Sequence, residues 1–227
     1  MEQSHCEIIR RADALYRERE RIENIHASVE LLESAAAVAA ADFETMWRSG
    51  RALFFLGQEA ETKTAAREFH ARGAQACERA ARLAPGRVEG HFWLGVNLAL
   101  QAQATNPLTA IRLARRARRS LERAVRIDPG FHDAGPLRVL ARLKHKLPRL
   151  LGGNRALAQA DFIRAIELAP SNTVTRIYFA ELLLEMGDVA SARRELETVL
   201  ELPLRPEWKF ETERDRRLAQ QMLDRIE

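Results

Sequence analysis

One helix ending recurs four times along this 227-residue chain. ERAARLAP (78–85), ERAVRIDP (122–129) and IRAIELAP (163–170) each close an amphipathic pattern with proline, and ETVLELPL (197–204) keeps the pattern with its proline one place early. Proline cannot continue a helix, because it lacks the backbone donor and clashes with the preceding turn. The fixed recurrence of one helix ending predicts a helical repeat array.

The clearest repeat unit runs from Gly153 to Pro170. Ala158 and Phe162 belong to one apolar helical face, and the same pattern returns 34 residues later, where Gly187 replaces Gly153. A further helix fits between Pro170 and Gly187. This order of helix, glycine turn, helix and proline resembles the tetratricopeptide repeat (TPR), which has the same period.

Composition agrees with an all-α chain. Apolar residues make up 46% and aromatic residues only 6%, and the good helix formers Ala, Leu, Arg and Glu dominate. We expect one domain over 1–227, a TPR-like α-α superhelix (solenoid) of about four helix pairs with extra N-terminal helices and a C-terminal capping helix. The expected parts are N-terminal helices in 1–42 (8–23 and 25–40), pairs at 43–84, 88–128, 134–169 and 173–202 within 43–202, and a cap in 203–227 (helix 211–226).

A small residue marks the first helix of each pair, which predicts a close helix crossing there. These residues are Gly50, Gly95, Ala141 and Ala180. Their spacing exceeds 34 residues, so the earlier units are expected to carry insertions between the paired helices. We place the insertions in ETKTAAREF (61–69), QAQATNPLTA (101–110) and LPRLLGGN (147–154).

Three motifs go beyond a plain TPR array: HFWLGVN, GPLRVLARL and KLPRLLGGN. With them, residues 27–222 resemble the T component of tripartite ATP-independent periplasmic (TRAP) transporters, the TatT-like family. The resemblance implies a helical-repeat protein that partners the solute-binding component of the transporter. It also implies a periplasmic lipoprotein that assembles as a trimer with a ligand-accessible cavity.

Catalytic and metal-binding signatures are missing from the sequence. There is no HExxH, no phosphate-binding loop and no GxSxG elbow. His91 has only Glu89 near it, two residues away and on another face of the helix. Cys6 and Cys77 suggest no disulfide framework. We therefore predict no enzyme, no cofactor and no metal site.

The first helices of such arrays line the concave face, which predicts a groove. Its lining is expected to be apolar in the N-terminal part and cationic in the middle, suited to an apolar or anionic amphiphilic ligand or a peptide carboxylate. The alternative is that the aromatic side chains fill gaps between helices and the arginines are solvated. The predicted lining residues are Trp47, Arg51, Phe54, Phe92, Val96, Arg138, Arg142, Lys146 and Ile177.

Charge is distributed unevenly. Residues 112–155 contain 13 basic residues and three acidic ones, although the whole chain is only +4. Five arginines fall three or four residues apart and form a basic stripe, which we predict contacts a protein partner. Nucleic acid is disfavoured because no aromatic residue interleaves the stripe. The alternative is an exposed face balanced by acids of a neighbouring helix or subunit. The stripe consists of Arg112, Arg116, Arg119, Arg123 and Arg126.

Two functional hypotheses remain. The first is a non-catalytic scaffold similar to the TRAP T component, and the second is a cytoplasmic TPR adaptor that binds a partner peptide in the concave groove. No signal peptide or lipobox precedes Cys6, so a cytoplasmic protein is expected as the sequence stands, and a periplasmic one if an export signal has been removed. The apolar run Ala35–Ala41 is too short to span a bilayer.

Overall fold

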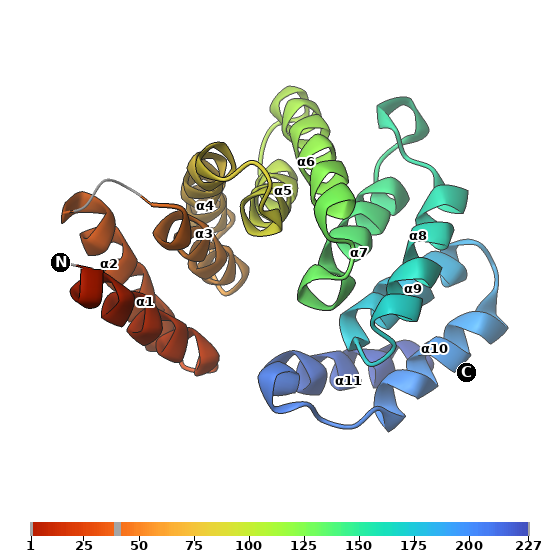
Figure 1. Cartoon of the computed structure of the whole chain (residues 1–227). Coiled ribbons are helices and arrows are strands. Elements are labelled where there is room, and N and C mark those ends of the chain that lie inside the picture. Colours follow the sequence, from red (N-terminus) through yellow and green to blue (C-terminus); the bar gives the residue numbers. More distant parts are fainter. Residues whose placement is uncertain (1, 39–41, 227) are drawn as a thin grey trace. The chain divides into compact units, whose positions relative to one another are not determined.

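The computed structural model describes residues 2–38 and 42–226, and every regular element in them is helical. Within these residues it contains eleven α-helices and two short 3-10 helices (Figure 1). The all-α prediction is therefore confirmed. Contacts divide the chain into two compact units, 1–128 and 129–227, which we describe separately. The single domain over 1–227 stays a prediction.

Unit 1 is a succession of neighbouring helices. α1 packs on α2 and α2 on α3; α3 then pairs with α4 and α5 with α6, while α4 and α3 both contact α5. This contact pattern is that of stacked helix pairs. The helices are α1 (Glu2–Arg17), α2 (Ile22–Val38), α3 (Phe43–Gln58), α4 (Lys63–Leu83), α5 (Val88–Gln103) and α6 (Pro107–Ile127).

Unit 2 repeats the arrangement. α7 pairs with α8 and α9 with α10, α8 and α7 contact α9, and α11 closes the unit against α9 and α10. Its core includes Phe162, Phe179 and Leu196, all buried. The elements are α7 (Phe131–Lys146), η1 (Arg149–Leu151), α8 (Arg155–Leu168), α9 (Thr173–Glu185), α10 (Val189–Glu201), η2 (Pro206–Trp208) and α11 (Lys209–Leu223).

The predicted helix endings are confirmed. The second helix of each pair stops two residues before its proline. Side chains that accept backbone N–H groups define several helix starts, as when Asn106 Oδ1 accepts the amide of Thr109 at 3.1 Å, next to Pro107 in the first turn of α6. The four endings are Leu83, Ile127, Leu168 and Glu201.

The small residues do lie at close crossings. A Cβ added to Gly50 would come within 1.9 Å of Cys77 Sγ, and one added to Gly95 within 2.6 Å of Leu121 Cγ. Ala141 and Ala180 are fully buried at the corresponding places of unit 2. Burial raises the pKa of the Cys77 thiol, which acts as a small core residue as predicted.

Two of the three predicted insertions are wrong. Most of ETKTAAREF lies within α4, and QAQATNPLTA is divided between the end of α5 (101–103), a short loop (104–106) and the start of α6 (107–110). The helices α4 and α6 are 21 residues long against 13 for α10. The extra residues lengthen helices instead of loops, because Thr62 and Asn106 cap α4 and α6 and so start these helices inside the two segments. Of the three segments, LPRLLGGN alone lies wholly between paired helices, where it forms η1 and a left-handed turn at Gly152.

The N-terminal helices start earlier than predicted. α1 covers Glu2–Arg17 instead of 8–23, and α2 begins at Ile22. The Asn24 side-chain amide donates to Glu18 O at 3.1 Å and fixes the turn between them. The predicted end of the second helix, Ala40, lies outside the described residues.

Candidate functional site

The helix α6 has a buried apolar face and, on its opposite side, an exposed basic face. Leu113, Ala117, Leu121 and Ala124 lie in the core of unit 1, and the arginines lie opposite because helical neighbours recur every three or four residues. The predicted stripe is joined by Arg115, which has the same orientation. We call this surface the arginine face, which consists of Arg112, Arg115, Arg116, Arg119, Arg123 and Arg126.

Few acids compensate the arginine face. Arg116 pairs with Glu78 of α4 at 2.7 Å, and Arg123 donates to the carbonyl of Pro85 at 3.3 Å. The other four arginines have no hydrogen bond or ion pair with any residue in the described part of the chain: Arg112, Arg115, Arg119 and Arg126. Within unit 1, the alternative of a face balanced by neighbouring acids therefore applies to Arg116 alone.

A cleft of about 250 Å³ opens in the middle of the arginine face, between α4, α5 and α6. Leu94 and Leu98 of α5 form its apolar floor with little exposed surface, at 9% and 2% exposure, and three arginines form its cationic rim. Ser120 Oγ donates to His91 O at 2.8 Å and ties α6 to α5. The lining residues are Glu78, His91, Leu94, Leu98, Arg116, Arg119, Ser120 and Arg123.

His91 borders this cleft as a neutral residue at pH 7. Burial lowers the pKa of its imidazole and the nearby charge of Arg123 lowers it further, against an opposing effect of the Pro85 carbonyl. His91 Nε2 lies 3.1 Å from Pro85 O and must donate, because a carbonyl can only accept. The ring therefore fixes the start of α5.

The predicted groove residues of unit 1 are mostly packed. Phe92 and Val96 are buried, at 2% and 6% exposure. Trp47 Nε1 donates to Glu44 at 2.9 Å. Arg51 pairs with Asp13 of α1 at 2.6 Å, and the Phe54 ring packs at a tilt against the Trp93 ring, with centroids 5.2 Å apart. The gap-filling alternative describes these contacts, and ligand binding here stays a prediction.

The predicted cationic residues of unit 2 are also engaged. Arg142 holds both oxygens of Glu181, at 2.6 and 3.2 Å, and Lys146 lies 2.7 Å from Glu185. Arg138 is only 6% exposed, and Ile177 is buried. Charges that are neutralised within the chain attract an anionic ligand weakly. The structure thus pairs Arg142 and Lys146 with acids of α9 and buries Arg138, while Lys146 stays exposed.

Arg138 supports an unusual turn at the start of α7. His132, Asp133 and Ala134 have φ values of 53°, 52° and 56°, a left-handed conformation that costs L-residues free energy. Arg138 Nη1 donates to Asp133 O at 2.8 Å, and Arg205 holds the Asp133 carboxylate at 2.7 Å. These two bonds keep the turn in place, so Arg138 acts as an internal brace.

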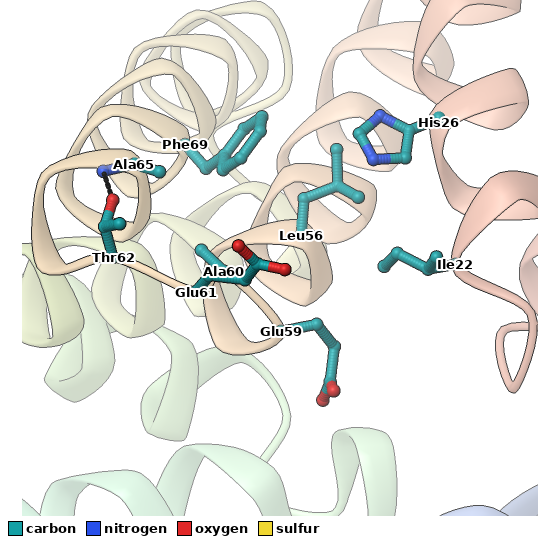
Figure 2. Close-up of a pocket in the computed structure, with 9 residues that line it drawn as sticks. All are labelled: Ile22, His26, Leu56, Glu59, Ala60, Glu61, Thr62, Ala65 and Phe69. Carbon is teal, nitrogen blue, oxygen red and sulfur yellow. Dashed lines mark hydrogen bonds between the residues drawn. The ribbon is translucent and has the colours of Figure 1, made fainter.

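The sequence did not predict a second pocket in unit 1. It measures about 400 Å³ and lies between α2, α3 and α4. In Figure 2, His26, Leu56 and Phe69 surround it, and Thr62 caps α4 at its rim by accepting the Ala65 amide at 3.1 Å. Part of its wall comes from ETKTAAREF, the segment misread as an insertion. No catalytic motif marks these residues.

No group of three His, Cys, Asp or Glu side chains in 2–38 and 42–226 is arranged to hold a metal ion. In the same residues no helix is both long enough and apolar enough to cross a membrane.

Comparison with known proteins shows to which family the chain belongs. The model of the family described as TRAP transporter T-component matches residues 28–227. The chain belongs to this family. The resemblance seen in the motifs HFWLGVN, GPLRVLARL and KLPRLLGGN is thereby confirmed. No curated protein matches the sequence.

Similar solved structures are TPR-like helical repeat proteins. A thermophilic TPR protein of Thermus thermophilus is 19% identical to this T component, with a TM-score of 0.69 over 95% of this chain and 98% of that one. MamA from Desulfovibrio magneticus is 18% identical, with a TM-score of 0.56 over 85% and 94% of the two chains. At these identities the likeness establishes the TPR-like fold only. Family and fold are both of non-enzymatic kinds.

Unit 2 of the T component is expected to lose stability in acid. Burial alone would raise the pKa of Glu185, but the Lys146 ammonium at 2.7 Å and the His145 ring at 2.9 Å outweigh it and lower the pKa to about 2. Because this is below the ordinary 4.5, the carboxylate stabilises the fold above about pH 4.5, and the contribution is lost as pH falls towards 2. Glu185→Gln should flatten that dependence in urea unfolding measured across this range.

The matched control is Glu167→Gln on the exposed face of α8, where the carboxylate has no ion pair with a described residue. It should leave the acid dependence as in the wild type. An unchanged profile for Glu185→Gln would show that this carboxylate is not stabilised by its neighbours.

Proposed function

We propose that this T component is a non-catalytic scaffold that binds a protein partner through the arginine face of α6. The partner proposed from the family is the solute-binding component of a TRAP transporter. One observation carries the proposal: four exposed arginines on one helix have no acid among the described residues of their own chain to pair with. A row of like charges is costly to keep unless it serves solubility or binding.

The chemistry of the face suits a protein better than a nucleic acid. A guanidinium presents its N–H groups in a fork that matches a carboxylate. Single-stranded nucleic acid is usually held by aromatic stacking as well as by charge, and α6 contains no aromatic residue. Complementary charge accelerates encounter and selects partners more than it adds affinity.

The proposal is tested by reversing the charge of three residues of the arginine face. Arg112→Glu, Arg119→Glu and Arg126→Glu together should weaken binding of the solute-binding component roughly 10- to 100-fold at low salt, since each exposed pair contributes up to about 1 kcal/mol. Isothermal titration calorimetry against the purified partner measures the loss. The difference should shrink as salt rises, because exposed charges are screened.

A matched control carries the same change in charge elsewhere. Arg164, Arg217 and Arg225 are exposed and lie in unit 2; reversing these three to Glu should change the affinity less than about threefold. Equal losses in the two triple variants would mean that only net charge matters and would contradict the proposed site.

A further inference from the structure

The arginine face is not uniform along α6. At its middle, Arg116, Arg119 and Arg123 border a cleft whose apolar part is Leu94 and Leu98. Near its ends, Arg112 and Arg126 lie outside that cleft. Contacts between proteins are usually dominated by a few residues that enter a preformed, partly apolar recess, while surrounding charges contribute little each.

We propose that this cleft is the anchor of the contact and accepts an apolar side chain of the partner that is flanked by carboxylates. The inference rests on the proposed function and adds the class of partner segment: acidic, with one leucine-like residue in its centre. The apolar side chain would lie over Leu94, which keeps 9% of its surface exposed, and against the methylene stems of the neighbouring arginines, and its flanking carboxylates would reach the guanidinium groups at the rim.

The charges of the cleft favour an anion even after internal pairing. Its three arginines face a single acid, Glu78, which pairs with Arg116 at 2.7 Å. Arg123 makes only a long bond, 3.3 Å, to the Pro85 carbonyl, and Arg119 has no partner among the described residues. Arg119 and Arg123 are therefore the groups that gain most from a carboxylate, and a bidentate arginine–carboxylate contact is the strong form of that bond.

The cleft is held in shape before any partner arrives. Gly95 lets α5 approach α6 so closely that a Cβ would meet Leu121. Ser120 ties α6 to the carbonyl of His91, and the His91 ring is tied in turn to Pro85. A recess that need not be ordered on binding lowers the entropic cost of the contact. The side chains that bring α5 and α6 together thus also form the anchor.

The two parts of the face should act differently in binding. Arg112 and Arg126 attract an acidic partner from a distance, which raises the association rate and is screened by salt. Arg119 and Arg123 make close contacts, which determine how slowly the complex dissociates. This difference separates an anchored contact from a diffuse electrostatic one.

The experiment compares two pairs of variants with the same change in charge. Arg119→Glu with Arg123→Glu alters the cleft, and Arg112→Glu with Arg126→Glu alters its flanks; all four residues are exposed on one helix. The probes are fluorescein-labelled peptides of the type Glu-Glu-Leu-Glu-Glu, with Ala in place of Leu or Gln in place of Glu. Fluorescence anisotropy gives their affinities, and thermal melting checks that each variant folds.

The cleft pair should weaken binding of the leucine peptide by at least about 30-fold, and the flank pair by less than about fivefold. Leu→Ala in the peptide should cost the wild type roughly tenfold, the free energy of one buried apolar side chain. The same Leu→Ala change in the peptide should hardly alter its affinity for the cleft-pair variant, because that variant no longer holds the leucine.

Failure of the anchor and failure of the proposed function would give different results. If the two pairs lose affinity equally, or if the leucine peptide binds no better than the alanine peptide, the anchor is wrong while the arginine face can still bind the partner. If neither pair changes binding of the peptide or of the solute-binding component, the proposed function fails too. Vesicles with one-third phosphatidylserine are the remaining arm: binding to them, without binding to any peptide, would assign the face to lipid and overturn the inference.

Discussion

Replacing Phe92 by Ala is expected to lower the free energy of unfolding by about 3–5 kcal/mol. Phe92 is 2% exposed and meets Trp93 with ring centroids 4.8 Å apart. The truncation would remove much of its buried apolar surface and leave a cavity among closely packed helices. Urea denaturation followed by circular dichroism measures the loss from the shift of the unfolding midpoint.

Two controls accompany it. Phe92→Leu keeps most of the volume and should cost less than the alanine variant. Gln103→Ala at the exposed end of α5 should change stability by no more than about 0.5 kcal/mol. A loss below about 1 kcal/mol for Phe92→Ala would mean that Phe92 lines an open groove, as the sequence predicts, instead of filling the core.

The helix ends and the basic stripe were readable from the sequence because both depend on local rules. A proline stops a helix wherever it stands, so the endings at Leu83 and Ile127 follow from the chain alone. Arginines three and four residues apart share a face in any helix, and the face of α6 is exposed as its pattern indicates. The close crossing at Gly95 follows from a small residue amid large ones.

The groove was not readable, because exposure depends on partners far along the chain. Arg51 is engaged by Asp13 of α1, and Arg142 by Glu181 of α9, 39 residues later. Helical periodicity predicts on which face of the helix each arginine lies, but it does not predict which acid the arginine pairs with. The left-handed turn that ends in Ala134 likewise depends on Arg205, which is 72 residues from Asp133. No local pattern signals such contacts.

Segment length misled the prediction of insertions for a related reason. The added residues near Thr62 and Asn106 could lengthen a loop or a helix, and the repeat period is the same in both cases. Local capping decides between them: both residues accept backbone amides and start helices of 21 residues. The loops that precede α4 and α6 can therefore stay short.

Gly95→Leu should lower the free energy of unfolding by about 1–3 kcal/mol. Glycine inside a helix is itself worth about 1 kcal/mol less than alanine, so the substitution destabilises only if the packing cost exceeds that gain. A Cβ here would lie 2.6 Å from Leu121 Cγ and 3.3 Å from Ala117 O. Leu121 is fully buried, so relieving this contact requires the packing around it to shift and pushes α5 and α6 apart.

Gly86→Leu is the matched control, because a Cβ at Gly86 meets nothing within 4 Å; thermal melting should change by an amount equivalent to no more than about 0.5 kcal/mol. A double-mutant cycle of Gly95→Ala with Leu121→Ala tests the contact directly. If the two residues clash, the cost of Gly95→Ala should fall when Leu121 is truncated, with a coupling of about 0.5–3 kcal/mol. Additive effects would show that the crossing of α5 and α6 tolerates a larger side chain at Gly95, and that the shape of the cleft does not depend on this glycine.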